Sequence, residues 1–284
     1  MQNTPDYPSV PEAAKENISN SSLYEFAWLG KLRTHEERRL GIGSPDTFDR
    51  LANIASHEPW GEAARPNSED IGILLYYITN TFARAVDEGT ILPDFENQAA
   101  VFNTGLLTEN QEDIYGIFTA TTSHGNIKPW SLKDWFVSSN GQLERFPELP
   151  GPVVHSEEPS DYYFDWHLPL ESRFFNIEHL VSTSFSRAAG EIPYGLGLAV
   201  KAATEHARGI ASRMPGTAVP SWDFKKSAVQ ILLPLFLSTP VHPDAAVALT
   251  RIRDTYIADE VIPLDFAYKR ARLVTRPHAR WLAR

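Results

Sequence analysis

The sequence predicts an α+β fold: a single domain with a mainly antiparallel sheet packed with helices. Helical periodicity occurs in separate blocks, and runs rich in β-branched and aromatic residues occur between them without regular βαβ alternation, which disfavours a doubly wound parallel sheet. Hydrophobic residues make up 42% of the 284-residue chain, enough for a sizeable core. Residues 1–20 are polar and rich in Asn, Ser and Pro, so we expect a flexible N-terminal arm ahead of one domain over residues 21–284. No internal repeat is apparent.

Two helices are expected in the first third of the chain. The first begins at Ser44-Pro45, with Ser44 as N-cap and Pro45 as the first helical residue. The second runs from about Asn67 to Glu88, since apolar residues recur there at helical spacing, and Gly89 is expected to end it.

Strand patterns follow these helices. Ala100–Phe102 reads as a strand that leads into a turn at Asn103–Gly105, and Asp113–Ala120 is expected to pair with it as a hairpin. Trp130 and Trp135 flank what we expect to be a short turn or helix.

The second half begins after a proline-rich, acidic connection at residues 147–159, the best candidate for a domain boundary. An extended segment at 164–170, a helix near 177–187 and a longer helix at 196–214 are expected next. The last elements are a buried strand at 227–237 broken at Pro234, strands at 245–252 and 260–264, and a short basic helix at 266–273.

Composition excludes several classes of function. The chain has no Cys, which removes disulfides, thiolate catalysis and Cys-ligated metal centres. The N-terminus lacks a signal-peptide layout, and the longest apolar run, Ile231–Leu237, is too short to span a bilayer. We therefore expect a cytoplasmic protein without a membrane partner. Neither a Walker loop, a GxGxxG fingerprint nor a serine-hydrolase elbow is present.

The charge is unevenly distributed. The net charge is −10, which argues against non-specific binding to long nucleic acid. From Arg251 to Arg284, eight Lys/Arg face four Asp/Glu, so this segment is +4 and the remainder is −14. No acidic side chain follows Asp265. A local basic segment on an acidic protein suits a small anionic ligand better than a duplex.

Several stretches together resemble one family of unknown function, number 3825, which is found beside OST-HTH (LOTUS) modules and with cold-shock-type domains. The stretches are LYEFAWLGKL from Leu23, AVFNTGLLTENQEDIYGIF from Ala100, NIEHL from Asn176, FKKSAVQILLPLFL from Phe224 and VIPLDFAYKRARLVTRPHARWL from Val261. The resemblance covers roughly residues 23–282 and implies work on RNA or nucleotides by association. We expect no OST-HTH or cold-shock segment within the sequence itself, which makes the RNA interpretation less favoured.

The first candidate ligand-binding segment is Asn103, Thr104 and Gly105 with Thr108. A Gly after a strand lets backbone N–H groups converge on an anion, and the Asn and Thr side chains add donors. The segment also matches the resembled family. The alternative is a plain turn in which Asn103 bonds its own backbone.

The second candidate is the basic group Lys269, Arg270, Arg272 and Arg276. On a helix Lys269, Arg272 and Arg276 share one face, and Arg grips phosphate bidentately. The alternative is a solvated basic face.

A third candidate group contains Asp165 and His167 with Asn176, Glu178 and His179. On a strand Asp165 and His167 point to one side, so these residues predict an acid–base group with His179. Their spacing matches no established metal motif, and we expect neither a metal nor a cofactor.

The fourth candidate group is Lys225, Lys226 and Gln230. Gln230 in a buried strand must find partners, either a base edge or, more simply, the core. Four tryptophans could stack a nucleobase or lie in the core, namely Trp60, Trp130, Trp135 and Trp281.

Together these residues predict a protein that binds a phosphorylated, nucleotide-like small molecule and acts on it as a hydrolase or transferase. Asn103, Thr104 and Gly105 would hold the ligand, Arg272 and Arg276 would neutralise phosphate, and the remaining predicted contacts would come from the other candidates above. The alternatives are a non-enzymatic module for single-stranded RNA and a protein-interaction scaffold.

Overall fold

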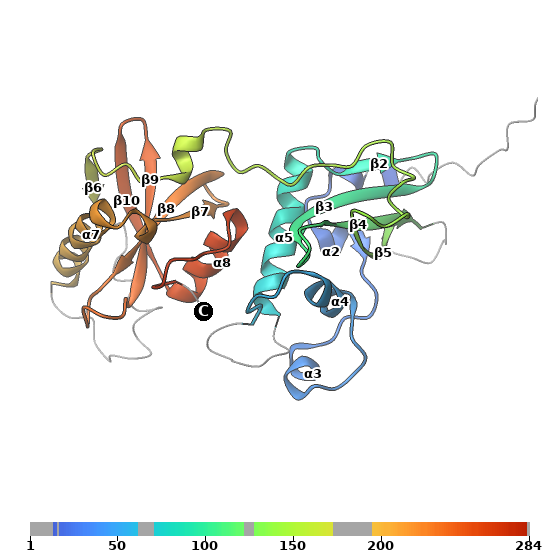
Figure 1. The fold of residues 1–284 in the computed structure, drawn as a ribbon, viewed down its shortest axis with the longest axis horizontal. Coiled ribbons are helices and arrows are strands. Elements are labelled where there is room, and N and C mark those ends of the chain that lie inside the picture. Colours follow the sequence, from blue (N-terminus) through green and yellow to red (C-terminus); the bar gives the residue numbers. More distant parts are fainter. Residues whose placement is uncertain (1–13, 16, 62–70, 122–127, 173–194, 283–284) are drawn as a thin grey trace, which may run out of the picture. The chain divides into compact units, whose positions relative to one another are not determined.

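The computed structural model describes residues 14–15, 17–61, 71–121, 128–172 and 195–282. The chain divides into two compact units, Met1–Val153 and Val154–Arg284, called unit 1 and unit 2 (Figure 1). Their boundary falls inside the connection at 147–159 that the sequence marks as the best candidate. The family-length single domain stays a prediction, and each unit is described by itself.

The helices of unit 1 precede most of its sheet. They are η1 (Asn17–Ser19), α2 (Leu23–Phe26), α3 (His35–Leu40), α4 (Thr47–Ile54) and α5 (Gly72–Asp87). The expected start of α4 was wrong by two residues, because Asp46 rather than Ser44 is the N-cap and forms a capping box with Asp49. Gly89 follows α5 at φ 68° as expected. The expected start near Asn67 was wrong, because Ile71 is the N-cap and α5 begins at Gly72; Asn67 itself lies outside the described residues.

Unit 1 contains a five-stranded sheet in the order β1-β5-β4-β3-β2. The strands are β1 (Ala27–Trp28), β2 (Leu92–Asp94), β3 (Ala99–Leu107), β4 (Asp113–Ala120) and β5 (Trp130–Val137). The pair β1 and β5 is parallel and the others are antiparallel, and the expected pairing of β4 with β3 is confirmed. The expected turn or helix between Trp130 and Trp135 was wrong, because this segment forms β5 and pairs with β4 along its length.

The predicted turn at Asn103–Gly105 was also wrong in kind. β3 continues through it, and the register with β4 shifts between Asn103 and Leu107. Gly105 takes a φ of 69°, a left-handed conformation that a bulge requires and glycine adopts without a Cβ penalty. The sequence signal for a turn therefore marks a β-bulge.

The face of this sheet toward α5 is held by a cluster of aromatic side chains. Phe82 of α5 lies 5.3 Å from Phe102 and 5.9 Å from Phe118 between ring centroids. Phe26 of α2 lies 5.0 Å from Phe118 and stacks on Trp130 at 5.8 Å. The tilted and edge-on contacts are those that aromatic rings prefer. The opposite face packs against Leu143 and Phe146, which follow β5.

Unit 2 contains a second five-stranded sheet in the order β6-β10-β9-β8-β7. Its strands are β6 (Leu170–Ser172), β7 (Val219–Asp223), β8 (Ala228–Leu235), β9 (Ala245–Ile252) and β10 (Thr255–Ile262). The expected bounds of β9 are confirmed. β8 is not broken at Pro234, which pairs with Ala246 inside the strand. The expected strand at 260–264 was the end of the longer β10.

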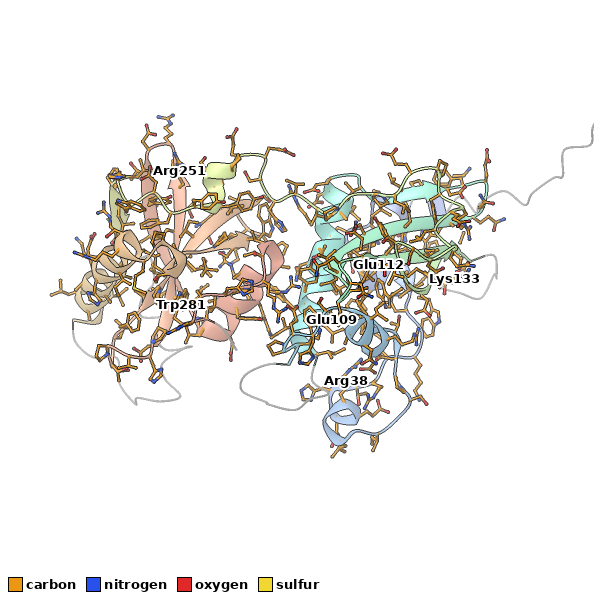
Figure 2. All side chains as sticks on the ribbon, in the orientation of Figure 1. Arg38, Glu109, Glu112, Lys133, Arg251 and Trp281 are labelled. Atoms are coloured by element: carbon orange, nitrogen blue, oxygen red, sulfur yellow. The ribbon has the colours of Figure 1, made fainter. Side chains whose placement is uncertain are left out.

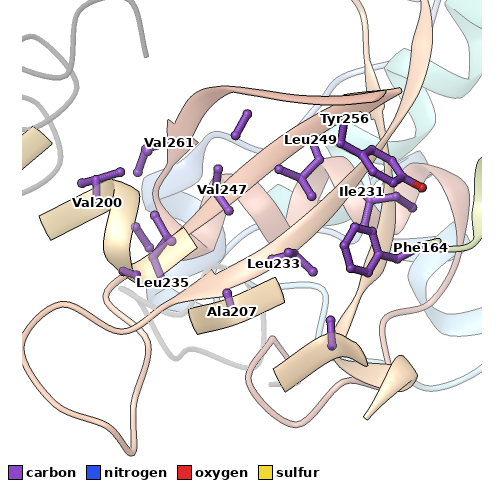
Figure 3. Packing of buried hydrophobic residues seen from close by; sticks show 14 residues of the cluster. Phe164, Val200, Ala207, Ile231, Leu233, Leu235, Val247, Leu249, Tyr256 and Val261 are labelled. Atoms are coloured by element: carbon purple, nitrogen blue, oxygen red, sulfur yellow. The ribbon is translucent and has the colours of Figure 1, made fainter. Parts of the chain in front are cut away.

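The helices of unit 2 lie on both faces of this sheet. They are η2 (Pro159–Tyr162), α7 (Leu196–Arg213), η3 (Pro215–Thr217) and α8 (Leu264–Val274), so both helices expected at 196–214 and 266–273 are confirmed within one or two residues. Figure 3 shows the aliphatic cluster between α7 and the sheet, with Val200 and Ala207 of α7 against Leu233 and Val247.

The two units share one connectivity within the described elements. In each, the first strand lies parallel to the last, and the four later strands form an antiparallel meander. In each, a long helix comes between the first and second strands, and this helix packs against the third: α5 on β3 and α7 on β8. The sequence shows no repeat, so this correspondence is visible only in the topology.

The α+β class and the mostly antiparallel pairing are confirmed. Of the expected N-terminal arm, Ala14 is buried and its carbonyl accepts a hydrogen bond from Trp130 Nε1 at 3.0 Å; residues 1–13 and 16 lie outside the described part. The helix expected near 177–187 lies outside it as well. Among the described helices, none combines the length and the apolar character needed to cross a membrane.

Candidate functional site

The side chains of Asn103 and Thr104 make their hydrogen bonds inside unit 1. Asn103 Nδ2 donates to the carbonyl of Pro150 at 3.0 Å, and Asn103 Oδ1 accepts from the N–H of Gly105 at 2.8 Å. Thr104 Oγ1 donates to the carbonyl of Ile114 at 2.7 Å. Both side chains are buried. These bonds hold the bulge in place. They agree with the alternative interpretation of the sequence, in which Asn103 bonds to its own backbone instead of to a ligand.

Gly105 and Thr108 complete this local structure. A Cβ at Gly105 would lie 2.7 Å from the Tyr77 hydroxyl oxygen, so the glycine lets Tyr77 approach the bulge. Thr108 Oγ1 accepts from the N–H groups of Asn110 and Glu112, both at 3.2 Å, and thereby closes the β3–β4 loop. Ligand contact by this segment stays a prediction.

Gln230 and Arg270 belong to a buried polar network between the sheet of unit 2 and α8. Gln230 Nε2 donates to Thr250 Oγ1 at 2.7 Å, and its Oε1 accepts a short hydrogen bond from Arg270. Arg270 also pairs with Asp223 at 3.2 Å and Glu260 at 2.8 Å. Gln230 thus finds its partners in the core, as a buried amide must.

The other basic candidates are more exposed. Lys269 and Arg272 lie half-buried on α8, and Lys225 is exposed in the β7–β8 turn, where its N–H donates to Asp223 Oδ1 at 2.9 Å. Arg276 is exposed beyond the end of α8. The expected shared helical face of Lys269, Arg272 and Arg276 was therefore wrong for Arg276, because the helix ends at Val274.

The expected strand that carries Asp165 and His167 is a turn. The N–H of His167 donates to Asp165 Oδ1 at 3.0 Å, an Asx-type turn, so the two side chains do not project from one side of a strand. His167 is exposed. His179, Asn176 and Glu178 lie outside the described residues, and the acid–base group stays a prediction.

The four candidate stacking tryptophans separate by burial. Trp130 and Trp135 are buried, and their indole N–H groups donate to the carbonyls of Ala14 and Thr47. Trp60 is also buried. Trp281 is only half-buried, so it retains surface that a ligand can reach.

Trp281 lines a cavity of unit 2, which we call the Trp281 pocket. Its volume is about 580 Å³, within the usual range for small-molecule sites. The residues around it come from the end of α7, from η3, from the end of β8 and from the C-terminal segment; they are Ile210, Met214, Pro215, Gly216, Thr217, Pro234, Phe236, His278, Ala279, Arg280 and Trp281.

Local hydrogen bonds position the pocket walls. Trp281 Nε1 donates to the carbonyl of Thr217 at 2.8 Å, which ties the C-terminal segment to η3 (Trp281 is labelled in Figure 2). The N–H of Thr217 donates to the carbonyl of Met214 at 2.8 Å, and the N–H of Leu282 to that of Ala279 at 2.9 Å. Leu282 is buried. The indole is thus held at its polar edge.

The chemistry of this pocket is apolar with a basic rim. Phe236 and Trp281 supply aromatic surface, and His278 and Arg280 are exposed polar groups at its edge. No Asp or Glu lies among its described lining residues. Such a cavity accepts a flat apolar ring together with an anionic group, because aromatic faces stack on rings and Arg binds oxyanions through its planar fork.

Sequence reasoning identified part of this pocket. The acid-free basic segment and Trp281 were recognised, whereas Phe236, His278 and Arg280 were not assigned a role. The stretch RPHARWL contains four of the lining residues, and its basic side chains next to Trp281 were the available signal. Phe236 and Met214 come together with it only through the fold.

The described residues contain no group of three or more His, Asp or Glu side chains placed to hold a metal ion. The site therefore defines an α+β protein with an aromatic pocket and a basic rim.

The chain belongs to the family described as "Domain of unknown function (DUF3825)", whose model matches residues 51–281. This match spans all of the pocket's lining residues. No curated protein and no solved structure matches the chain.

Proposed function

We propose that the protein binds a phosphorylated, nucleotide-like small molecule in the Trp281 pocket. The base packs against Trp281 and Phe236, and Arg280 and His278 contact the phosphate. The observation that carries the proposal is the combination, in one cavity of about 580 Å³, of two aromatic side chains with two basic ones and no acid among the described lining residues.

Charge and size support this choice of ligand. The protein as a whole is acidic at −10, so an anion is repelled by most of the surface and needs a local basic site. Long nucleic acid requires many phosphate contacts along a groove, whereas the pocket offers two basic side chains. A mononucleotide satisfies both the cavity and the charge.

The proposal includes hydrolysis or transfer on the bound molecule. His278 is the imidazole among the described lining residues, and imidazole is the side chain that most often transfers protons in catalysis. His179, together with Asp165 and His167, remains the proton-transferring group predicted from the sequence. We place this activity in the cytoplasm, since a cysteine-free chain needs no oxidising compartment, and the family's association with OST-HTH modules and RNA belongs to the same proposal.

Calorimetry with the full chain and a panel of mononucleotides and dinucleotides tests the binding step. We expect at least one to bind more tightly than millimolar. Arg280→Gln should weaken binding by roughly tenfold or more, since hydrogen bonds to a charged group contribute about 1.5–3 kcal/mol. Arg253→Gln is the matched control, because Arg253 lies in the β9–β10 turn, away from the Phe236 end of β8.

A second variant tests the stacking step. Trp281→Phe keeps an aromatic ring, and Trp281→Leu removes it; affinity should fall more for Leu, by about 1–3 kcal/mol. Thermal unfolding of both variants separates loss of stacking from loss of the Thr217 hydrogen bond. If no nucleotide binds below millimolar concentration, the proposal is wrong. Binding of single-stranded RNA alone, falling steeply with salt, would favour the RNA module instead.

Chromatography of each bound nucleotide after incubation with the protein tests the chemical step. A new product that His278→Asn abolishes, with the nucleotide at a concentration that saturates the variant as well, is the expected result. Binding without any product would limit the function to recognition.

A further inference from the structure

A second cavity lies at the opposite end of β8 from the Trp281 pocket. Ala228 at the start of β8 lines this cavity, and Pro234 near its end lines the other. Its volume is about 170 Å³, and we call it the Arg251 cavity, after the side chain labelled in Figure 2. The polar groups around it are those of His155, Ser156, Ser160, Asp161, Ser227, Arg251 and Tyr256.

Two opposite charges line this cavity without neutralising each other. Arg251 and Asp161 are not within the 4.0 Å of an ion pair, and within the described part of the chain neither forms a salt bridge with another residue. Arg251 uses only Nε, which donates to the carbonyl of Arg253 at 3.1 Å. Both terminal nitrogens of its guanidinium therefore keep their donors available.

The carboxylate of Asp161 also keeps one oxygen without a hydrogen bond among the described residues. Asp161 Oδ2 accepts from Ser156 Oγ at 2.7 Å, and its other oxygen makes no hydrogen bond among the described residues. Ser156 is itself fixed, since its N–H donates to Tyr162 Oη at 2.8 Å and its carbonyl accepts from the same hydroxyl at 2.9 Å. The hydroxyls of Ser160 and Ser227 have no partner among the described residues either.

The floor of the cavity is apolar. Ile231 and Leu249 are buried members of the cluster under α7 (Figure 3). Val229 also lines the cavity and lies two residues before Ile231 on β8. Ile231 pairs with Leu249 across β8 and β9, and Arg251 pairs with Tyr256 across β9 and β10. Arg251 therefore stands two residues beyond Leu249 on the same face of the sheet.

The tyrosine at this edge is held in its neutral form. Burial raises the pKa of Tyr256, and the hydrogen bond from the N–H of Asp165 and the nearby Arg251 oppose this only in part. Its hydroxyl accepts from Asp165 N–H at 3.1 Å and donates to the carbonyl of Tyr163 at 3.3 Å. The cavity is therefore lined by Arg251 and Asp161 beside a neutral tyrosine.

We propose that the Arg251 cavity binds a small zwitterion, an α-amino acid with an aliphatic side chain. Its carboxylate pairs with Arg251, its ammonium group with Asp161, and its side chain lies on Val229, Ile231 and Leu249. A simple anion would meet the Asp161 carboxylate, and a simple cation would meet Arg251, whereas a zwitterion satisfies both charges at once. The small cavity suits an amino acid, and it shares no lining residue with the Trp281 pocket, so the two sites are independent.

Calorimetry with the full chain and L-valine, L-leucine and L-isoleucine tests the proposal. We expect saturable binding of at least one of them, and weaker binding of L-tryptophan, whose indole is larger than any aliphatic side chain. Two analogues of the best ligand keep the protein unchanged: the N-acetyl derivative removes the ammonium charge and the amide derivative removes the carboxylate. Each should bind roughly tenfold or more weakly, as expected for a lost charged hydrogen bond.

Variants assign the two charges. Arg251→Gln and Asp161→Asn should each weaken binding of the amino acid roughly tenfold or more. Arg253→Gln should leave it unchanged, because the Arg253 side chain lies in the β9–β10 turn and does not line the cavity. The Arg251→Gln variant should still bind the nucleotide of the Trp281 pocket, which separates the two proposals. Absence of binding by any aliphatic amino acid would overturn the inference, as would binding of inorganic phosphate alone that depends on Arg251.

Discussion

Units 1 and 2 have the same strand order but cores of different chemistry. The helix between the first two strands brings Phe82 into an aromatic cluster in unit 1, and brings Val200 and small alanines onto aliphatic strands in unit 2. In each unit, this helix covers one face of the sheet and packs against the third strand. The comparison shows that this connectivity tolerates very different side chains, which explains why the topology repeats although the sequence does not.

The opposite faces of the two sheets differ more. After the last strand, unit 1 covers its sheet with a segment without regular secondary structure that contains Leu143 and Phe146, whereas unit 2 uses α8. A buried amide on the third strand anchors the cover in each case. Asn103 binds the Pro150 carbonyl in unit 1, and Gln230 binds Arg270 in unit 2.

The largest effect should come from truncating the aromatic core of unit 1. Phe82→Ala removes a fully buried ring with three aromatic neighbours, and we expect a loss of about 3–5 kcal/mol in the free energy of unfolding. Hydrogen exchange with mass spectrometry should report it in peptides of unit 1. Leu233→Ala is the counterpart in unit 2, with about 2–5 kcal/mol expected there. Equal loss of protection in both units for either variant would show that they unfold together, as one domain.

Breaking the ionic anchor of α8 should cost nearly as much. Arg270→Met leaves the buried Asp223 without its main cation, and we expect a loss of about 3–5 kcal/mol. Adding Asp223→Asn to Arg270→Met should restore part of that loss, because the uncompensated charge is removed. A double variant as unstable as the single one would contradict the charge argument and point to lost packing of α8.

The uncharged anchor of unit 1 should be weaker. Asn103→Leu removes the hydrogen bonds to Pro150 and Gly105 and leaves their backbone groups unpaired, for about 1–3 kcal/mol. Exchange protection of the amides near residue 150 should fall most. If Asn103→Leu retains this protection but abolishes nucleotide binding, the original prediction of ligand contact at Asn103 would be supported over the anchoring role.

These anchors also show what sequence can and cannot predict. Periodicity placed α5, α7, α8 and β9 well, since burial of one face imposes a spacing that is legible along the chain. The predictions failed where a local sequence signal fits two structures. Asn-Thr-Gly fits either a turn or a bulge. A proline in an apolar run fits either a break in a strand or, as at Pro234, a residue inside the strand. For the site, Trp281 and the basic segment were recognisable, but Phe236 and Arg251 were not, because their cavity neighbours are brought together only by the fold.

The basic segment and the Asn103–Gly105 bend lie in different units, so their predicted shared ligand site remains a prediction. Local hydrogen bonding explains why the sequence pattern was misleading there: the polar residues of a buried bulge and those of a binding loop are of the same types. Sequence alone gives no measure of whether an amide is already satisfied.

Acid should weaken unit 1 through Asp46. Burial acts to raise the pKa of Asp46, but hydrogen bonds from the N–H of Arg33, the Arg38 guanidinium and the N–H of Asp49 outweigh it, so the pKa is lower than usual. A lowered pKa means that the stabilisation is complete above the unfolded value near 3.9 and is lost as pH falls below it. The slope for this single proton is at most about 1.4 kcal/mol per pH unit. Asp46→Asn keeps an N-cap side chain and should flatten the decline in unit 1 between pH 4 and 2. An unchanged slope would assign the acid sensitivity to other carboxylates, such as Asp244 in unit 2, whose pKa is also lowered.

The smallest effect separates two glycines of unit 1 that share a left-handed backbone. Gly89 ends α5 at φ 68° and a Cβ there would meet open space, whereas a Cβ at Gly105 would lie 2.7 Å from the Tyr77 hydroxyl. Gly89→Ala should therefore cost about 1 kcal/mol, the strain of the conformation alone. Gly105→Ala should cost more, because Tyr77 must also move, and combining it with Tyr77→Phe should recover the difference. Chemical denaturation of the three variants measures this. If Gly105→Ala costs no more than Gly89→Ala, the Tyr77 hydroxyl does not fill the space beside Gly105. The bulge at Asn103–Gly105 would then have space for a ligand.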